Sequence, residues 1–198
     1  ARMDSLLSSL VSAFAEEPEG CRTDRFREHV RDVILSEAPD IQAIYKYVSC
    51  DCHKYTRNLI FENEDFALVC LCWGPKQSST IHDHPESDCW LTVVNGSLKE
   101  TQFPLPSSSF TKPMVPCAQD CLKKGDIAYL RDELDVVHSI GNESEDVFAV
   151  SLHVYAPPLH HCNVYCPETG KCNSVCMSYR EGASVGRSEE DVRRLLKA

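Results

Sequence analysis

Apolar residues in the first quarter of the chain recur at helical spacing. The first stripe consists of Leu6, Leu7, Leu10, Val11 and Phe14. The second consists of Phe26, Val30, Val33 and Ile34, in a segment that Asp24 can cap and that ends before Pro39. Residues 41–48 favour a short third helix. Because each stripe covers one side of a helix, the pattern predicts an N-terminal helical layer over about residues 4–48.

From Tyr55 onward the pattern changes to short runs of β-branched, aromatic and apolar residues separated by turn residues. Clear runs cover residues 66–73, 89–94, 127–130 and 148–155. Asn95-Gly96 is a strong signal for a hairpin turn, and Gly125 and Gly141 interrupt the chain in a similar way. Residues 104–116, which are rich in Pro and Ser, are expected to form a surface loop.

The order of these segments indicates the fold class. Strands that follow one another without helices between them form antiparallel sandwiches or barrels instead of doubly wound sheets. We therefore expect a mainly β fold, an antiparallel β-barrel or jelly roll over about residues 55–180, preceded by the helical layer. Ser188 and Asp191 favour a short C-terminal helix over about 189–197. A chain of 198 residues fits a single domain over residues 1–198.

Charge and cysteine content narrow the range of partners and settings. A net charge of −10 argues against a nucleic-acid partner or an anionic membrane surface, because both need clustered Lys and Arg. No apolar run has the length of a membrane span. Residues 6–15 loosely resemble a secretory signal, but they follow Asp4 where a signal has basic residues, so an amphipathic helix is expected. These features favour a monomeric, cytoplasmic protein with a small-molecule partner, in which most of the twelve Cys are free thiols.

The sequence His82-Asp83-His84 is the first sign of metal chemistry. Residues two apart in a strand face the same side, so both imidazoles can converge on one point while Asp83 faces away. Because imidazole is the commonest transition-metal ligand, a metal site is one interpretation of this pair. Two incidental surface histidines are the other.

Spacing further along the chain favours the metal site. Six residues separate Cys89 from Gly96. Further along the chain, Gly125 opens a strand, and after it three residues separate His138 from Asn142. This arrangement resembles the two motifs of the cupin superfamily, with Cys89 where cupins normally have a metal-binding Glu. A ligand set of three His without a carboxylate would leave an Fe(II) centre with its full positive charge. Such a centre can take an anionic thiolate and still keep a position for dioxygen.

Several separated motifs resemble cysteine dioxygenase in order and spacing from about Tyr55 to Tyr179. They are Tyr55-Thr56-Arg57-Asn58-Leu59, Cys72-Trp73-Gly74, Ile81-His82-Asp83-His84 with Cys89, and Ser151-Leu152-His153-Val154-Tyr155-Ala156-Pro157-Pro158. The resemblance implies a cupin-type fold and a non-haem iron enzyme that converts L-cysteine and O2 to cysteine sulfinic acid. It implies no organic cofactor.

The resemblance also implies which residues hold the metal and the substrate. It places Fe(II) on His82, His84 and His138. It assigns the substrate carboxylate to Arg57, whose planar fork of donors can bind both oxygens, with Tyr55 assisting.

A second group of residues is implied to surround the reacting atoms. Cys89 and Tyr155 correspond to a pair joined by a thioether bond, a cofactor made from the protein itself. Ser151 and His153 alternate with Tyr155 along one strand, so the three can form a hydrogen-bonded chain that fixes the phenol. The other residues implied to surround the substrate pocket are Trp73, Cys162 and Met177.

Each of these residues also has a plain structural interpretation. His138 could be a loop histidine, Arg57 a surface cation and Cys89 a buried, inert thiol. Tyr155 and His153 could be core residues with satisfied hydrogen bonds. Two rival functions follow: a dioxygenase for another small thiol, such as 3-mercaptopropionate or an N-terminal cysteine, and a cupin that only binds or senses metal.

Structural zinc is a further alternative, because cysteines are dense near the end of the predicted barrel. Cys162, Cys166, Cys172 and Cys176 lie close in sequence to His160 and His161. Both cysteine pairs have the spacing C-x₃-C, whereas zinc pairs most often have C-x₂-C, so zinc is the weaker interpretation. The remaining cysteines expected to be free thiols are Cys50, Cys52, Cys70, Cys117 and Cys121.

Overall fold

The computed structural model describes residues 3–17, 23–107, 112–131, 135–180 and 190. Its helical elements are α1 (Met3–Ala15), α2 (Asp24–Glu37) and the 3-10 turns η1 (Ile41–Ala43) and η2 (Tyr45–Tyr47). Its strands are β1 (Thr56–Glu62), β2 (Ala67–Trp73), β3 (Ile81–His82), β4 (Asp88–Asn95), β5 (Ser97–Pro104), β6 (Ala118–Lys123), β7 (Ile127–Leu130), β8 (Val136–Gly141), β9 (Ala149–Ala156), β10 (His161–Tyr165) and β11 (Cys172–Cys176). Two 3-10 turns therefore replace the helix expected over 41–48. The helix expected over 189–197 falls almost wholly outside the described residues.

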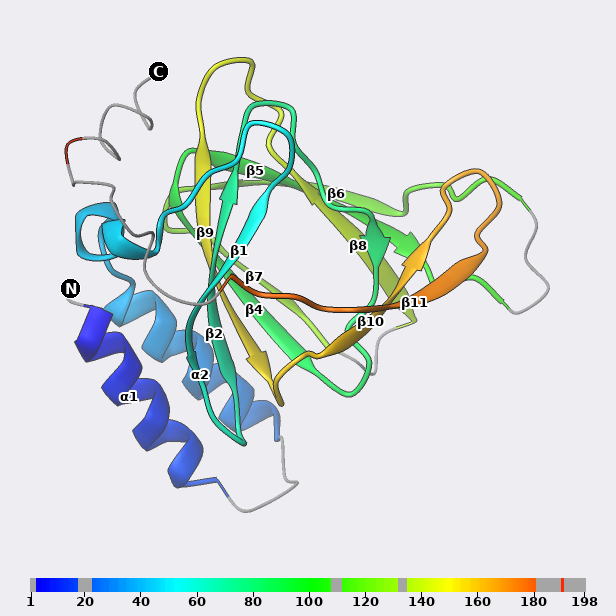
Figure 1. Cartoon of the computed structure of the whole chain (residues 1–198). Helices are drawn as coiled ribbons and strands as arrows, with labels where there is room; N and C mark the ends of the chain where they lie inside the picture. The colour runs from blue at the N-terminus through cyan, green and yellow to red at the C-terminus, as the bar shows by residue number, and fades with distance from the viewer. Residues whose placement is uncertain (1–2, 18–22, 108–111, 132–134, 181–189, 191–198) are drawn as a thin grey trace.

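The strands form two antiparallel sheets that face each other (Figure 1). One has the order β1-β2-β9-β4-β7 and the other the order β11-β10-β3-β8-β5-β6. Every residue of β2 and β9 is buried, because one face of their sheet looks toward the other sheet and the opposite face is covered by helices. No named strand of the described residues pairs across the two sheets. The expected jelly roll is therefore confirmed, whereas the barrel is not closed.

The two helices form the predicted layer on the outer face of the first sheet (Figure 1). Leu10, Val30 and Ile34 pack in one buried cluster with Leu68 and Trp90 from the strands. This burial explains why the apolar stripes of both helices face the same way. No described helix combines the length and apolar character needed to cross a membrane.

The start of α2 differs by one residue from the sequence prediction. Thr23, not Asp24, is the N-cap, and its hydroxyl accepts a hydrogen bond from the backbone N–H of Phe26 at 3.2 Å. Asp24 lies in the first turn, where a negative charge is favourable. Both residue types are good caps, so composition alone could not separate them.

A buried ion pair joins the helical layer to the strand that carries Cys89. Arg27 Nε lies 2.9 Å from Asp88 Oδ2, and the two side chains are only 9% and 1% exposed. Asp88 is the first residue of β4 and Cys89 is the second. The ion pair thus fixes the beginning of β4 against α2.

The turn at Asn95-Gly96 is not the hairpin that the sequence predicts. Gly96 has the expected left-handed φ of +71°. However, β4 pairs with β7 and β9, while β5 pairs with β6 and β8, so the turn carries the chain from one sheet to the other. A Cβ at Gly96 would lie 3.0 Å from the carbonyl oxygen of Phe148, which also favours glycine there. A turn motif specifies the local backbone conformation, whereas the partner strands are chosen by the packing of the whole sheet.

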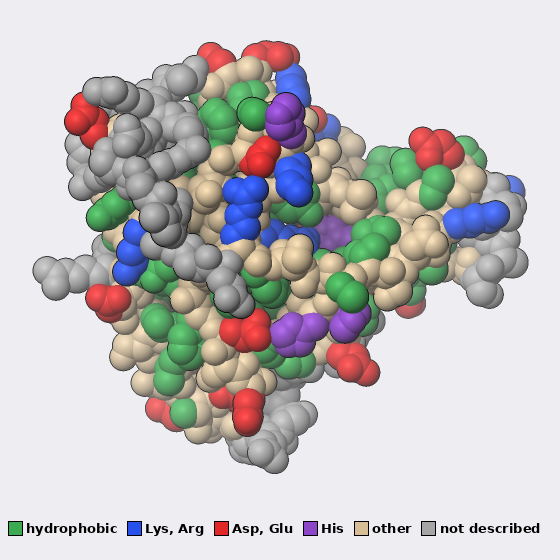
Figure 2. All heavy atoms as spheres, in the orientation of Figure 1, with side chains coloured by type: hydrophobic (Ala, Val, Ile, Leu, Met, Phe, Trp, Pro, Cys, Tyr) green, Lys and Arg blue, Asp and Glu red, His purple; other side chains and the backbone are tan. Residues whose placement is uncertain are grey.

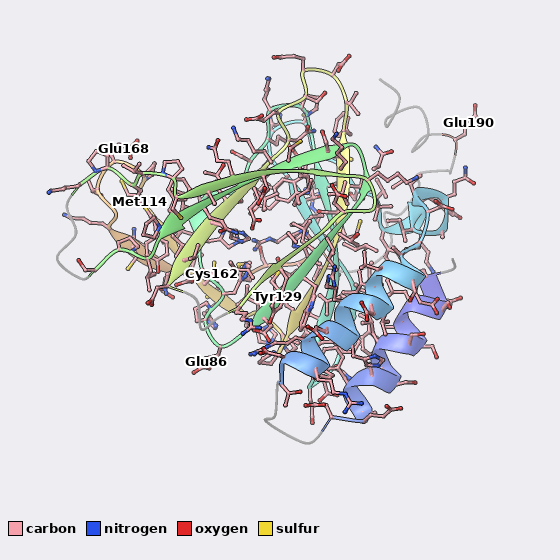
Figure 3. The ribbon with its side chains drawn as sticks, turned by 180° about the vertical axis from the view of Figure 1, so that it is seen from behind. Glu86, Met114, Tyr129, Cys162, Glu168 and Glu190 are labelled. Carbon is pink, nitrogen blue, oxygen red and sulfur yellow. The ribbon has the colours of Figure 1, made fainter. Side chains whose placement is uncertain are left out.

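The Pro- and Ser-rich segment is only partly a surface loop. Residues 108–111 lie outside the described residues, and Pro104 is the last residue of β5. Met114 is buried in a small cluster with Phe103, Val137 and Tyr165, and its N–H donates to the carbonyl of Pro167 at 2.8 Å. This cluster attaches the loop to the projecting end of the second sheet, where Figure 3 shows Met114 near Glu168.

Candidate metal and substrate site

Three buried histidines meet in the space between the two sheets. His82 ends β3, His138 lies in β8, and the two residues are directly paired in the register. His84 lies two residues after β3 ends, so the strand alternation expected for the pair does not extend to it. The three side chains offer ligand atoms that all lie within 4.8 Å of one another. The three residues are only 3–5% exposed.

The hydrogen bonds of these histidines leave ring nitrogens facing one another. His82 Nδ1 lies 3.0 Å from the carbonyl oxygen of Thr80, and a carbonyl can only accept, so Nδ1 carries the proton. His138 Nδ1 lies 2.7 Å from Oε1 of the buried Glu100 and likewise donates. In both rings Nε2 therefore keeps its lone pair for another partner.

Burial favours the neutral form of the imidazoles of His82 and His84. Burial, followed by the neighbouring histidines, holds the pKa of His84 well below its usual range, and burial also lowers that of His82. Both ring nitrogens of His84 and Nε2 of His138 are buried without a hydrogen-bond partner among the described residues. Because unpaired buried nitrogens are costly, this set of convergent lone pairs fits a divalent transition metal.

Asp83 faces away from the cluster, as the sequence suggested. Its carboxylate accepts hydrogen bonds from the backbone N–H of Asn163 at 2.7 Å, from Asn163 Nδ2 at 2.8 Å and from the Tyr165 hydroxyl at 2.8 Å. These bonds attach the segment between His82 and His84 to β10. They restrict how far the two imidazoles can move apart.

Glu100 is a functional candidate that the sequence reasoning missed. Leu98 and Glu100 alternate along β5 and are both buried, so an inward-facing acid in a strand was the available signal. Glu100 binds His138, which is 38 residues away in sequence. The two residues meet only in the folded sheet, where β5 pairs with β8.

Glu100→Gln is expected to weaken metal binding by about 10- to 100-fold, because the amide is a weaker acceptor for His138 Nδ1–H than a carboxylate. Competition with a coloured chelator measures this affinity. Glu143→Gln is the matched control, because that carboxylate is exposed and pairs with Lys99 on the surface. Equal metal affinity in both variants would rule out Glu100 as a support for the ligand.

A cavity of about 310 Å³ lies directly beside the histidines. Its lining includes Tyr55, Arg57, His82, Cys162 and Met177. Figure 2 shows the hollow beside the β10–β11 projection, with basic and histidine side chains inside it. Cys162 comes from β10 and lies on the inner side of that projection, away from Glu168 at its tip (Figure 3). The cavity therefore reaches the histidine cluster at His82.

Arg57 brings unsatisfied donors to this cavity. Its Nη1 lies 2.7 Å from Met177 Sδ, and its Nε is buried without a hydrogen-bond partner among the described residues. The guanidinium lies 5.5 Å from the ring centre of Tyr55, and that ring stacks on Trp73 at 4.6 Å. A half-buried cation whose acceptor is a thioether is chemically suited to an anionic ligand.

Ser151, His153 and Tyr155 form a continuous chain along β9. Ser151 Oγ lies 2.9 Å from His153 Nε2, and His153 Nδ1 lies 3.2 Å from the Tyr155 hydroxyl oxygen. Trp73 Nε1 donates to Ser151 Oγ at 3.0 Å, so the Ser151 proton is available to His153 Nε2. Burial, followed by the Arg57 charge, lowers the pKa of His153 well below its usual range. The neutral ring can then carry its proton on Nδ1, directed at the phenol oxygen.

Cys89 and Tyr155 are directly opposite each other on paired strands. They are register partners of β4 and β9. Cys89 Sγ lies 3.9 Å from His153 Nδ1, and the Tyr155 ring centre lies 5.5 Å from that of His84. Burial raises the pKa of the Cys89 thiol and that of the Tyr155 phenol, so both groups are protonated at neutral pH. Cys89 and Tyr155 thus lie next to the three-histidine cluster.

Tyr179 lines the cavity, although no sequence motif indicated it. Its hydroxyl donates to the carbonyl of Leu159 at 2.8 Å, and burial raises the pKa of the phenol to about 12. It lines the same cavity as Arg57. Since Tyr179 follows β11 and has no characteristic spacing to the other site residues, only the fold brings it there.

The cysteines considered for zinc have other neighbours. Cys162 Sγ lies 3.4 Å from Met177 Sδ, and Cys166 Sγ lies 3.1 Å from the Glu168 carboxylate. Cys172 and Cys176 are exposed on β11. Within the described part of the chain, the His82, His84 and His138 set is the group whose ligand atoms converge.

Comparison with known proteins identifies similar sequences. The family described as cysteine dioxygenase type I matches residues 26–168. Cysteine dioxygenase type 1 of Danio rerio is 39% identical over 153 residues, which cover 77% of this chain and 76% of that protein. The human protein of the same name is 36% identical over 153 residues, with the same coverage. A solved structure from Klebsiella pneumoniae, an uncharacterized conserved protein with a double-stranded β-helix domain, has a TM-score of 0.47 and 21% identity, and covers 67% of this chain and 87% of its own.

Proposed function

Because the chain belongs to the cysteine dioxygenase type I family, we propose that it is a non-haem iron enzyme that oxidises L-cysteine with O2 to cysteine sulfinic acid. The observation that supports this most directly is the cluster of three buried histidines beside a cavity that contains an unsatisfied guanidinium. The first feature suits a transition metal and the second suits a small carboxylate.

In this proposal His82, His84 and His138 hold Fe(II). When bound, the ion supplies a Lewis acid that favours the thiolate form of the substrate and the redox capacity that a reaction with O2 requires. Burial keeps the imidazoles of His82 and His84 neutral, while hydrogen bonds to the Thr80 carbonyl and to Glu100 orient those of His82 and His138. The ligand set therefore keeps the positive charge that attracts a thiolate.

Arg57 and Tyr55 orient the substrate. The carboxylate of cysteine binds the Arg57 guanidinium and displaces the Met177 thioether, which is a much weaker acceptor. Because His82 and Arg57 line the same cavity, a substrate held at its carboxylate end can direct its sulfur to the histidine cluster. Fixing both the carboxylate and the sulfur of the substrate lowers the entropic part of the activation barrier. Trp73 supports the position of Tyr55 through ring stacking.

The chain from Ser151 through His153 holds the proton of Tyr155 at the phenol oxygen. Burial keeps that phenol neutral, so it can donate a hydrogen bond to a group that gains negative charge beside it. Cys162 and Met177 contact each other in the lining of the cavity and reduce the space left for water around the substrate.

We further propose that Cys89 and Tyr155 become joined by a thioether bond between Cys89 Sγ and a ring carbon of Tyr155. Formation would remove the thiol hydrogen and one ring hydrogen, and O2 would take up these two hydrogens as hydrogen peroxide. Their position as directly opposed residues of β4 and β9 supports this pairing.

Protein isolated after many turnovers is therefore expected to contain a species lighter by two hydrogens, measured by intact mass and peptide mapping. Cys89→Ser is expected to lack that species yet keep part of its activity, because the bond orders the site but holds no iron. Cys121→Ser, which removes an exposed thiol of β6, is the control that keeps it. Separate, unmodified Cys89 and Tyr155 peptides after extended turnover would contradict the pairing.

A thiol dioxygenase for another small thiol is the second candidate, because Arg57 would also bind 3-mercaptopropionate. Metal analysis of the purified protein followed by product analysis separates the candidates. The proposal predicts iron-dependent formation of cysteine sulfinic acid and slower reaction with 3-mercaptopropionate or with a peptide that begins with Cys. Stoichiometric zinc without any oxygen consumption would favour a cupin that only binds metal.

We place this activity in a reducing compartment, the cytosol. The cysteines of the described residues are all free thiols, including four exposed ones on β6 and β11 or near them, Cys117, Cys121, Cys172 and Cys176. Free exposed thiols persist where glutathione and thioredoxin keep them reduced, which supports this setting.

A further inference from the structure

The thioether of Met177 contacts Arg57, the cation proposed to bind the substrate carboxylate. Its Sδ lies 2.7 Å from Arg57 Nη1 and 3.4 Å from Cys162 Sγ, so an N–H and an S–H both donate to one sulfur. The backbone N–H of Met177 donates to the carbonyl of His160 at 2.7 Å, which fixes the chain at this point. The thioether therefore lies where an acceptor from the substrate would bind.

A thioether satisfies this guanidinium poorly. Sulfur of this kind is a weak hydrogen-bond acceptor, and Arg57 Nε has no partner at all among the described residues. A carboxylate can displace such a contact at little cost. Oxidation of the same sulfur to a sulfoxide would place a polar, strongly accepting oxygen beside the same donors. The sulfoxide oxygen would then compete with the substrate carboxylate for Arg57.

Met177 is also the most accessible of the methionines. The chain has three, and the other two, Met3 and Met114, are 5% and 9% exposed in apolar clusters. Met177 is half-buried at the rim of the cavity. A small oxidant that enters the cavity therefore meets this thioether and the Cys162 thiol beside it.

We propose that Met177 is a reversible oxidation site through which peroxide lowers the affinity of the enzyme for its substrate. In this reaction one oxygen of hydrogen peroxide is transferred to Sδ, the O–O bond breaks, water is released and the sulfur loses two electrons. The sulfoxide oxygen accepts from Arg57 and occupies the position of the substrate carboxylate. Methionine sulfoxide reductase reverses the change with two electrons and two protons from a dithiol, and the oxygen leaves as water. This inference rests on the proposed use of Arg57 as the carboxylate anchor.

The test treats the full-length protein with hydrogen peroxide, reduces its thiols with dithiothreitol and reloads it with Fe(II). Peptide mapping is expected to find sulfoxide at Met177 before Met114. The KM for L-cysteine is expected to rise by about tenfold, the size of effect that one competing hydrogen bond to a charged group can produce, while kcat changes little. Subsequent treatment with methionine sulfoxide reductases A and B should restore the original KM, which thiol damage would not allow.

Two variants make the assignment specific to this residue. Met114→Leu should show the same rise after peroxide as the unmodified protein. Met177→Leu should keep after treatment whatever KM it had before, because leucine cannot be oxidised in this way. A rise in KM that survives the reductases, a rise in Met177→Leu, or Met177 sulfoxide without any rise would each overturn the proposal.

A binding measurement separates this proposal from the proposed function. Calorimetric titration of the Fe(II)-loaded protein with L-cysteine in the absence of oxygen reports affinity without turnover, and oxidation should weaken it by a similar factor. If the untreated protein binds cysteine in this assay but never yields sulfinic acid, the dioxygenase assignment fails while the role of Met177 is still tested. If oxidised and untreated protein bind equally, the oxidation site fails.

Discussion

The His138→Ala variant is expected to lose both bound iron and the ability to oxidise cysteine. His138 supplies one of three convergent imidazoles, and its removal leaves His82 and His84 as a two-ligand site in a buried space. The loss should exceed the roughly 100-fold that removal of an outer hydrogen-bond partner can cost, because a ligand itself disappears. Elemental analysis after gel filtration measures iron retention, and oxygen consumption with L-cysteine measures activity. His82→Ala and His84→Ala should behave in the same way.

His161→Ala is the matched control, because that imidazole is exposed at the start of β10 and outside the three-histidine cluster. It should retain iron and turnover. Full activity of the unmodified protein after iron has been removed and zinc added would contradict the assignment of these histidines to an iron site.

The Arg57→Ala variant is expected to lose most of its kcat/KM for cysteine. Removing one partner of a desolvated charge pair typically costs about 2–5 kcal/mol, or roughly 30-fold to a few thousandfold. Arg57→Lys should restore only part of the activity, because an ammonium cannot form two parallel hydrogen bonds to a carboxylate. Steady-state oxygen consumption over a range of cysteine concentrations gives these ratios.

Substrate analogues test the same contact by changing the ligand instead of Arg57. Cysteamine lacks the carboxylate and 3-mercaptopropionate lacks the amine, so both should be poor substrates of the unmodified enzyme. Arg180→Ala is the control, since Arg180 lines the same cavity but is exposed and paired with Asp51. If cysteamine reacts as well as cysteine, and Arg57→Ala changes neither rate, then Arg57 does not hold the carboxylate.

The fold was predictable wherever local pattern and long-range packing agree. The apolar run that became β2 is buried on both faces, so its β-rich composition gave a clear signal. At Gly96 the sequence correctly indicated a turn, and the turn has the positive φ that glycine favours. It could not indicate that the next strand would pair in the other sheet, because strand pairing depends on the whole arrangement of strands.

In the site, too, local pattern indicated some residues, and strand pairing brought in the others. His82 and His84 converge as the sequence suggested, but His84 lies beyond the end of β3, so strand alternation is not the reason. His138 joins them through the pairing of β3 with β8, and Glu100 reaches His138 from β5. Tyr179 enters the cavity from beyond β11, and no local pattern points to it. Residues brought in by strand pairing between distant segments carry little signal unless a family resemblance supplies it.

In the proposed reaction both atoms of one O2 molecule are transferred to the sulfur of free cysteine. The most direct test incubates the iron-loaded protein with L-cysteine under ¹⁸O₂ in unlabelled water and determines the mass of the product. We expect cysteine sulfinic acid with label in both sulfinate oxygens. Cystine as the only product, or a sulfinic acid whose oxygens come from water, would contradict it.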